Sequence, residues 1–127
     1  MGELRVYKLA FFVPDSHVEV VKAAVFAAGG GRIGDYDHCA WQTLGQGQFR
    51  PLHGSQPYLG QTGQVEVVEE WKVELVVADA LIAQVVAALK QSHPYETPAY
   101  EVWPRYGWLP CNGRNWPWPR VCQAQWS

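Results

Sequence analysis

Hydrophobic and polar positions change their spacing several times along the chain, and each change marks an expected element. The apolar run over residues 7–13 ends at Pro14 and predicts a strand that is covered on at least one face. Residues 16–28 repeat apolar side chains at helical spacing, and Ser16 with Glu19 matches a capping box at the start of that helix. Three glycines at 29–31 end the helix, because glycine adopts left-handed backbone angles without strain.

The middle of the chain has strand composition interrupted by a loop. Residues 35–51 predict a hairpin of two short strands around Gly45-Gln46-Gly47. Residues 52–64 are rich in glycine and polar side chains, which is typical of a long loop. Residues 65–77 alternate apolar and charged side chains, so we expect one long strand with a solvent-facing side.

A second helix and a last strand follow. Asp79 is the expected cap of this helix, and Pro94 is its expected stop. Its buried stripe consists of four apolar residues at helical spacing, namely Ile82, Val85, Val86 and Leu89. Residues 99–103 then form the last strand. The order β-α-β-β-β-α-β reduces to the split β-α-β of an α+β, ferredoxin-like sandwich, with two helices on one face of an antiparallel sheet.

The opposite face of this sheet has no element to cover it. Phe49, Trp71 and several valines are available to make that face apolar. Burial against identical subunits is the economical way to cover it, so we expect a homo-oligomer.

Composition narrows the class of protein. A length of 127 residues fits one ordinary domain, and a formal charge of -2 without a clustered basic surface excludes nucleic acid and anionic membranes as expected partners. The N-terminal residues show neither a signal peptide nor a spanning segment, which predicts a cytoplasmic location. The three cysteines, Cys39, Cys111 and Cys122, have no metal-finger spacing and are expected to be reduced thiols.

A series of ordered motifs resembles one known small domain. The motifs are Gly29-Gly-Gly-Arg-Ile-Gly-Asp-Tyr-Asp-His-Cys-Ala-Trp, Gly45-Gln-Gly-Gln-Phe-Arg-Pro, Gly54-Ser-Gln-Pro, Gly60-Gln-Thr-Gly and His93-Pro-Tyr-Glu-Thr-Pro-Ala-Tyr. Over residues 6–105 the chain is similar to the PII/CutA-like module that is inserted in YqfO-type members of the dinuclear-metal-centre hexamer family, the NGG-interacting-factor-three-like proteins. A free-standing short form of this module is the expected identity.

The resemblance implies both a fold and an assembly. It implies a ferredoxin-like fold and a trimer of the PII/CutA sort, in which ligands lie in clefts between subunits. The flanking halves that carry the two metal ions of the full-length proteins are missing from this sequence, so the resemblance transfers neither their metal site nor a hydrolase activity.

The segment from His93 to Tyr100 carries the first candidate chemistry. An imidazole and a carboxylate at His93 and Glu96 could form a ligand-binding or general-base pair. The competing interpretation is structural and is favoured: His93 complements the dipole of the preceding helix, and Glu96 pairs locally. Tyr95 and Tyr100 are expected to pack or hydrogen-bond at a subunit boundary.

The glycine-rich block offers a second candidate at Arg32. Gly31-x-x-Gly34 resembles a phosphate cradle, but such cradles open a helix and this one closes a helix, so the helix stop is favoured. The alternative that stays open is a small anion bound between Arg32 and a neighbouring subunit. The candidate ligand-binding residues are therefore His93, Tyr95, Glu96, Tyr100, Arg32 and Tyr36.

A metal site is the third candidate, and a divalent metal ion is the one cofactor that the residues indicate. The candidate ligands are His38, His53 and His93, because imidazole suits zinc or copper. Cys39 adjoins His38, but neighbours on a strand point to opposite faces and do not readily ligate one ion. Such a site would combine His38 with His53, or with His93 from this or another subunit.

Three functions are compatible with these observations. The first is an oligomeric regulatory module that binds a small ligand or a metal ion near residues 52–64 and 93–100; no catalytic motif is present, which favours it over an enzyme. The second is a metal-dependent hydrolase that uses His38, His53, His93 and Glu96. The third is a structural or partner-binding protein, in which a domain at 1–105 carries a Trp- and Pro-rich C-terminal extension at 106–127 that docks elsewhere.

Overall fold

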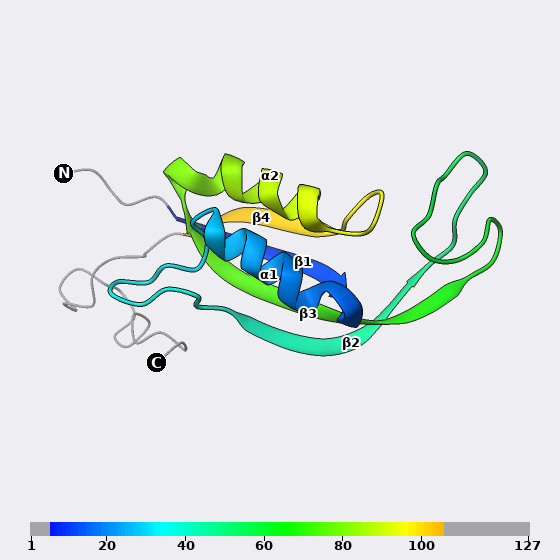
Figure 1. Cartoon of the computed structure of the whole chain (residues 1–127), viewed down its shortest axis with the longest axis horizontal. Coiled ribbons are helices and arrows are strands. Elements are labelled where there is room, and N and C mark those ends of the chain that lie inside the picture. Colours follow the sequence, from blue (N-terminus) through cyan, green and yellow to red (C-terminus); the bar gives the residue numbers. More distant parts are fainter. Residues whose placement is uncertain (1–5, 106–127) are drawn as a thin grey trace.

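The computed structural model of the chain describes residues 6–105, which form the elements labelled in Figure 1. The strands and helices are β1 (Val6–Pro14), α1 (Val18–Ala27), β2 (Trp41–Phe49), β3 (Glu66–Ala78), α2 (Ile82–Ser92) and β4 (Tyr100–Arg105). Short 3-10 helices at Asp15–His17 and Asp79–Leu81 precede the two α-helices. The expected extension at 106–127 lies outside the described residues.

The strands form one four-stranded antiparallel sheet in the order β2-β3-β1-β4. The strand β3 is 13 residues long, pairs with β1 and β2 on its two sides, and confirms the long strand expected from its alternating pattern. The strands β2 and β4 are the two edges of the sheet. Figure 1 shows that the β2–β3 ribbon projects beyond the end of β1 and carries the loop between its strands.

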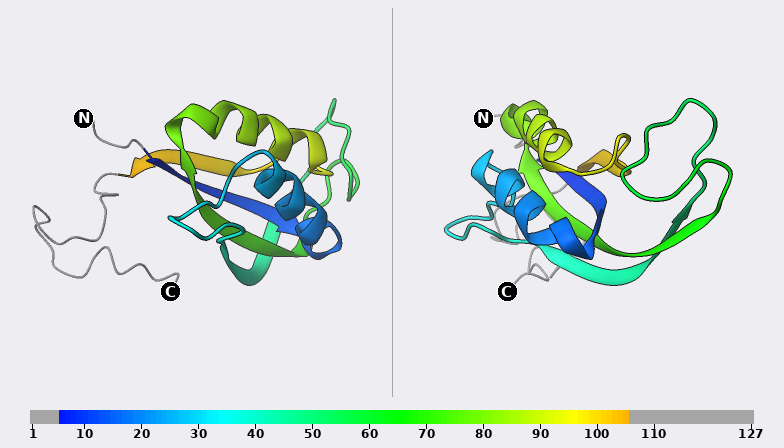
Figure 2. Two further views of the ribbon diagram at one scale, coloured as in Figure 1. Left: turned by 60° about the vertical axis from the view of Figure 1, so that its left-hand side comes forward. Right: turned by 45° about the vertical axis from the view of Figure 1, so that its right-hand side comes forward.

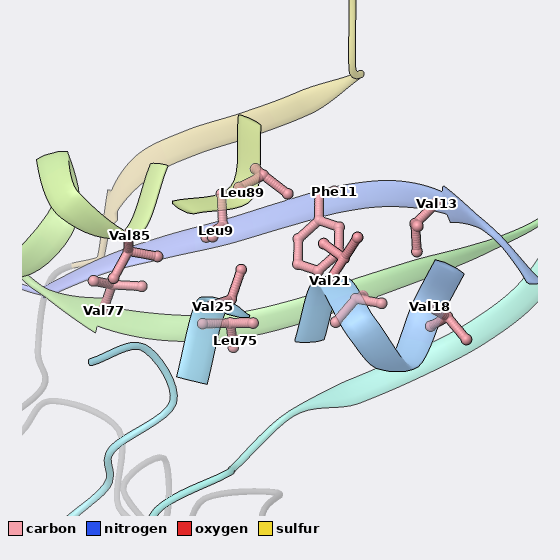
Figure 3. Packing of buried hydrophobic residues seen from close by; sticks show 11 residues of the cluster. Leu9, Phe11, Val13, Val18, Val21, Val25, Leu75, Val77, Val85 and Leu89 are labelled. Atoms are coloured by element: carbon pink, nitrogen blue, oxygen red, sulfur yellow. The ribbon is translucent and has the colours of Figure 1, made fainter. Parts of the chain in front are cut away.

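Both helices lie on one face of this sheet, and the two views in Figure 2 show the helix layer from the side. The core lies between the layers and consists of inward side chains of β1 and β3 with the apolar stripes of both helices (Figure 3): Leu9, Phe11, Val13, Val18, Val21, Val25, Val73, Leu75, Val77, Val85 and Leu89. Full burial of one such side chain contributes about 1.5–3 kcal/mol to stability. The predicted ferredoxin-like α+β sandwich is thereby confirmed.

The end of α1 follows the predicted glycine stop. Gly29 has a φ of 112° and Gly31 a φ of 80°, in the left-handed region that other residues rarely adopt. A Cβ atom at Gly31 would lie 2.8 Å from the carbonyl oxygen of Cys39 and 2.9 Å from the Phe26 ring. Glycine is therefore required here both by the backbone angle and by the close approach of the next segment.

The hairpin predicted around Gly45-Gln46-Gly47 is wrong. These residues lie in the middle of one continuous strand, β2, which pairs with β3 from Trp41 opposite Glu74 to Phe49 opposite Glu66. The glycines resemble turn residues locally, but a nine-residue register with a distant strand overrides that preference.

The two predicted helix caps are also wrong. No side-chain hydrogen bond caps either helix or the 3-10 turns before them. The hydroxyl of Ser16 lies 2.8 Å from His17 Nδ1 instead. Each strand passes directly into a 3-10 turn, and that turn supplies the entry to the helix.

Candidate functional site

Aromatic rings gather where the projecting ribbon, the start of α1 and the connection from α2 to β4 converge. Tyr95 is the centre of this group: its ring centroid lies 5.0 Å from that of His93, 6.0 Å from that of Phe49 and 6.2 Å from that of Tyr58. His17 contacts Tyr58 edge to face at 5.6 Å. Of the predicted site residues, His93 and Tyr95 belong to this aromatic cluster.

His93 occupies the turn that follows α2, and its side chain is only 7% exposed. Its Nε2 atom lies 2.7 Å from the carbonyl oxygen of Phe12 in β1, and its Nδ1 atom lies 3.1 Å from the backbone nitrogen of Tyr95. A carbonyl only accepts and a backbone N–H only donates, so Nε2 carries the proton and Nδ1 carries the free lone pair. These two bonds require the neutral imidazole.

The environment of the ring favours the same neutral state. Burial lowers the pKa of His93, and the positive form of nearby His17 acts in the same direction. The hydrogen bond to Phe12 and the charge of Glu70 oppose this effect without outweighing it. His93 therefore connects β1 to the α2–β4 turn as a neutral hydrogen-bonding group, and the expected partly positive ring at the helix end is wrong.

Tyr95 and Glu70 form the second polar connection of the cluster. The Tyr95 hydroxyl donates to Glu70 Oε2 at 2.8 Å, and the Glu70 carboxylate lies directly over Gly47 of β2, where a Cβ atom would overlap Oε1. Burial raises the pKa of Tyr95, and the hydrogen bond to Glu70 and its negative charge raise it further. Glu70 thus joins the α2–β4 turn to the edge strand.

Glu96 does not pair with His93. Its exposed Oε1 accepts the backbone N–H of Gln56 at 2.9 Å and so attaches residues 52–64 to the α2–β4 turn. Tyr100, at the start of β4, packs against the helix-side core, and the ammonium of Lys90 lies 5.6 Å from its ring centroid. The predicted segment therefore divides between the aromatic cluster, the loop contact and the core.

The remaining predicted residues lie at the other end of the domain, beyond the end of α1. Tyr36 is 74% exposed and forms a two-residue bridge with Ile33, next to exposed Arg32. His38 has a φ of 56°, contacts the Phe26 ring at 4.7 Å and lies 3.2 Å from Asp37 Oδ1. One turn of chain thus presents a guanidinium, a phenol and an imidazole to solvent.

The three predicted metal ligands are not brought together within one chain. His38 lies beyond the end of α1, His53 is exposed in the loop from β2 to β3, and His93 is buried at the start of the α2–β4 turn. Across residues 6–105, no group of three or more His, Cys, Asp or Glu side chains could hold a metal ion. Cys39 is a free thiol whose Sγ lies 3.6 Å from the carbonyl oxygen of Asp37.

The sheet face opposite the helices, called the open face below, was expected from the sequence, but the expected position of Trp71 on it is wrong. Trp71 lies opposite Val13 in β1, packs against the helix-side core, and donates from Nε1 to Asp15 Oδ1 at 2.8 Å. Residues directly opposite in antiparallel strands share a face, so the register assigns to the open face Lys8, Ala10, Phe12, Trp41, Thr43, Gly45, Glu70, Lys72, Glu74, Glu101 and Trp103. Trp41 is 53% exposed and Trp103 is 40% exposed. A groove of about 490 Å³ runs along β2 on this face, over Gly45, Lys72 and Phe12. The period-two pattern of β3 could have revealed Glu70, Lys72 and Glu74 as one row.

The fold places the chain in one class of domain, the ferredoxin-like α+β domain of the PII/CutA type, here with an open sheet face. Two solved structures with this fold are GlnK of Bacillus subtilis, with a TM-score of 0.54 and 16% identity, and CutA of Archaeoglobus fulgidus, with a TM-score of 0.57 and 15% identity. They cover 80% and 82% of this chain, which in turn covers 86% and 87% of theirs. At this identity the likeness concerns the fold alone.

Sequence relatives show that the chain is similar to part of a group of longer proteins. The chain is 45% identical over 98 residues to a protein of Halalkalibacterium halodurans named GTP cyclohydrolase 1 type 2 homolog, and 43% identical over 97 residues to the Bacillus subtilis protein of that name. The matches cover 77% and 76% of this chain but 26% of each relative, so the chain spans about a quarter of their length. No family model matches the sequence.

A solved structure matches over a similar share of its length. The Bacillus cereus protein related to NIF3 has a TM-score of 0.73 and 36% identity, over 84% of this chain and 27% of that protein. The resemblance to the module of NIF3-related, YqfO-type proteins is therefore confirmed for one segment of those proteins. Within residues 6–105, neither helix is long and apolar enough to cross a membrane.

Proposed function

We propose that the chain is a PII/CutA-like module that assembles into a homotrimer and holds a small molecule or a metal ion between its subunits, in a regulatory and noncatalytic role. The observation that carries this proposal is the open face, on which Trp41 and Trp103 remain about half exposed beside a groove. Apolar surface removed from water contributes about 25 cal/mol per Å², so association through this face is favourable.

The edges of the sheet support self-association. The outer sides of β2 and β4 have no strand partner in the described sheet, and such edges pair readily with another chain. A ring of identical copies satisfies both edges at once, because each copy offers its two different edges to two neighbours.

The position of the candidate ligand residues supports a shared cleft. Figure 1 shows the α2–β4 turn, which contains Tyr95 and Glu96, at one end of the domain and the segment after α1, which contains Arg32 and Tyr36, at the other. A single chain does not bring these groups together, so the proposed ligand contacts one end of one copy and the opposite end of the next. Arg32 makes the site suitable for an anionic group.

A metal ion in such a cleft would have to use the exposed imidazoles. Both ring nitrogens of His93 are already hydrogen-bonded, so a metal would have to displace Phe12 or Tyr95 from this ring. His38 of one copy and His53 of the next are therefore the proposed ligands, and His93 positions Tyr95 instead. The hydrolase hypothesis, which needs His93 and Glu96 together, has no comparable support.

Solution mass measurement by light scattering tests the assembly. Wild-type protein is expected at three times the chain mass, and Trp41→Gln is expected to require at least about tenfold more protein to assemble. Val20→Gln is the matched control, since Val20 is 55% exposed on α1, away from the open face. A monomeric wild type at every soluble concentration would overturn the proposal.

Thermal-shift measurements on the wild-type oligomer test the ligand. Nucleotides, small carboxylates and divalent metal ions are the probes, and a true ligand raises the melting temperature increasingly with its concentration. The rise is expected to disappear in Arg32→Gln for an anion, or in His38→Gln for a metal ion. If no probe raises the melting temperature, or if these variants leave the rise intact, the proposed cleft is wrong.

A further inference from the structure

Two half-exposed tryptophans mark the two edges of the open face. Trp103 lies in β4 opposite Lys8, and Trp41 lies in β2 opposite Glu74. Their exposed fractions are 40% and 53%, and Trp41 also lines the groove of about 490 Å³ along β2. Apolar surface of this kind is unfavourable in water, so an occupant that covers both indoles gains free energy.

The chain leaves the described structure at the edge of this same face. The strand β4 ends at Arg105, shortly after Trp103, and the C-terminal extension at 106–127 follows. Neighbouring strands are about 4.8 Å apart, so β2 lies about 14 Å from β4 across the sheet. A fully extended segment of this length reaches about 70 Å. The extension is therefore attached beside the open face and is long enough to cross it.

The composition of the extension suits an aromatic surface. It contains four of the seven tryptophans of the chain and three prolines: Trp108, Trp116, Trp118, Trp126, Pro110, Pro117 and Pro119. Proline-rich segments dock in grooves lined by aromatic side chains, because they lose little entropy when they become ordered. Trp41 and Trp103 offer aromatic surface of this kind on the open face.

Charge favours the extension over a second copy as the occupant. The open face carries three carboxylates and two ammonium groups, which are those of Glu70, Glu74, Glu101, Lys8 and Lys72. The extension contains Arg114 and Arg120 and has neither Asp nor Glu. The side chains of the face and of the extension therefore have net charges of opposite sign, whereas two open faces have net charges of the same sign.

Glu101 is the carboxylate of this face that has no partner. It lies in β4 opposite Ala10, is exposed, and makes neither a hydrogen bond nor an ion pair within residues 6–105. Glu74, by contrast, pairs with Lys8 at 2.7 Å, and Glu70 accepts from Tyr95. An arginine of the extension would therefore find its acceptor at Glu101, on the strand from which the extension starts.

Attachment to the same chain decides the competition between the two occupants. A segment on a short tether meets its own face at an effective concentration on the order of millimolar. A second copy at about 1 µM is about a thousandfold more dilute. The second copy displaces the extension only if it binds the face about a thousandfold more tightly.

We propose that the extension at 106–127 folds back over the open face of its own chain, with its indoles against Trp103 and Trp41 and an arginine on Glu101, and so limits association with further copies. The contact is autoinhibitory. This inference rests on the proposed function, since association through the open face is the event that the extension opposes.

Oxidative footprinting of the full chain measures the contact itself. The reaction is run at a concentration at which every protein is monomeric, and oxidation is read by mass spectrometry. Trp116→Gln/Trp118→Gln is expected to raise the oxidation rates of Trp41 and Trp103 by at least about twofold, because a tethered segment shields both indoles for most of the time. Tyr36, which is 74% exposed and is not on the open face, is the internal reference.

Sedimentation velocity over a concentration series measures the consequence for assembly. Trp116→Gln/Trp118→Gln is expected to lower the concentration at half assembly by about tenfold or more, because the second copy no longer competes with a tethered occupant. Gln123→Ser/Gln125→Ser is the matched control, since it changes two polar residues of the same extension. This control is expected to follow wild type in both measurements.

The outcomes separate this inference from the proposed function. If Trp41 and Trp103 are oxidised equally fast in wild type and in the tryptophan variant, the extension does not cover the face and the inference is wrong. The inference is also wrong if the tryptophan variant assembles less readily than wild type, because the extension then contributes to the contact between copies. Both results leave the proposed oligomer intact. If neither wild type nor the variant assembles at any soluble concentration, the proposed function fails, and the inference fails with it.

Discussion

His93 gives the sharpest test of the site, because its two hydrogen bonds require a neutral ring. Burial lowers the pKa of His93 in the folded chain, whereas in the unfolded chain it returns to the ordinary value near 6.5. Between these two pKa values the unfolded state binds more protons than the folded state. The stabilisation is therefore fully present above about pH 6.5 and is lost as the pH falls from there toward the lower folded-state pKa.

The size of the effect follows from the number of protons. One histidine gives a maximum slope of about 1.4 kcal/mol in the free energy of unfolding per pH unit.

Replacement of His93 is a separate test. His93→Ala leaves the buried Phe12 carbonyl and the Tyr95 N–H without partners, which is expected to lower the free energy of unfolding by about 2–4 kcal/mol. His93→Gln retains a polar side chain and removes the titration.

The slope of the free energy of unfolding against pH is measured by urea unfolding at one fixed protein concentration. The series runs from pH 5.5 to pH 8, about the range in which histidine titrates. Wild type is expected to lose stability toward the acid side, and His93→Gln is expected to lose less over the same interval. Val20→Gln is the control, because Val20 is 55% exposed on α1 and its replacement leaves the two hydrogen bonds of His93 in place. An imidazole NMR titration that places the pKa of His93 at or above 6.5, or equal slopes for wild type and His93→Gln, would refute the reasoning.

Two further predictions concern the polar link and the glycine stop. Tyr95→Phe removes the hydroxyl that donates to Glu70 and is expected to lower the free energy of unfolding in urea by about 1–2 kcal/mol. Gly47→Ala displaces the same carboxylate, so the double variant is expected to lose clearly less stability than the sum of the two single losses. Full additivity would contradict the connection from Tyr95 through Glu70 to Gly47. Gly31→Ala combines a φ of 80° with a contact of 2.8 Å between the new Cβ atom and the carbonyl oxygen of Cys39, and is expected to lower stability by more than about 2 kcal/mol. Gly34→Ala, at a φ of 57° in open space, is expected to lower it by about 1 kcal/mol. Equal losses in thermal unfolding would show that the close approach at Gly31 is unimportant.

The elements that local patterns predict well are those whose burial follows from their own periodicity. Val18, Val21 and Val25 repeat at helical spacing and are all buried, and the alternation over residues 65–77 corresponds to β3 almost to the residue. Gly45 misled the prediction of β2, because a glycine in an edge strand and a glycine in a turn have the same local signature. The deciding contact is the register with β3, which a local pattern does not contain.

The chemistry of the site was less predictable for the same physical reason. The partner of His93 is the carbonyl of Phe12, 81 residues earlier, and the partner of Glu96 is the backbone of Gln56, 40 residues earlier. Their proximity in sequence favoured a His93–Glu96 pair, but the fold satisfies each group elsewhere. Backbone acceptors leave no trace in side-chain identity, so a motif cannot show that an imidazole is already engaged.

Glu70 links the aromatic cluster to the edge strand β2. Its carboxylate accepts from Tyr95 in the aromatic cluster and lies over Gly47 in the edge strand, two residues from Gly45. A ligand that moves the Tyr95 hydroxyl must therefore either move Glu70 or leave it without its donor, and a displaced carboxylate changes the charge beside Lys72. The proposed ligand end and the proposed assembly edge thus share one group, which gives the module a route by which binding alters association. Hydrogen exchange of the β2 amides in Tyr95→Phe measures that route: faster exchange confined to residues near Gly47 supports it, and unchanged exchange there removes it.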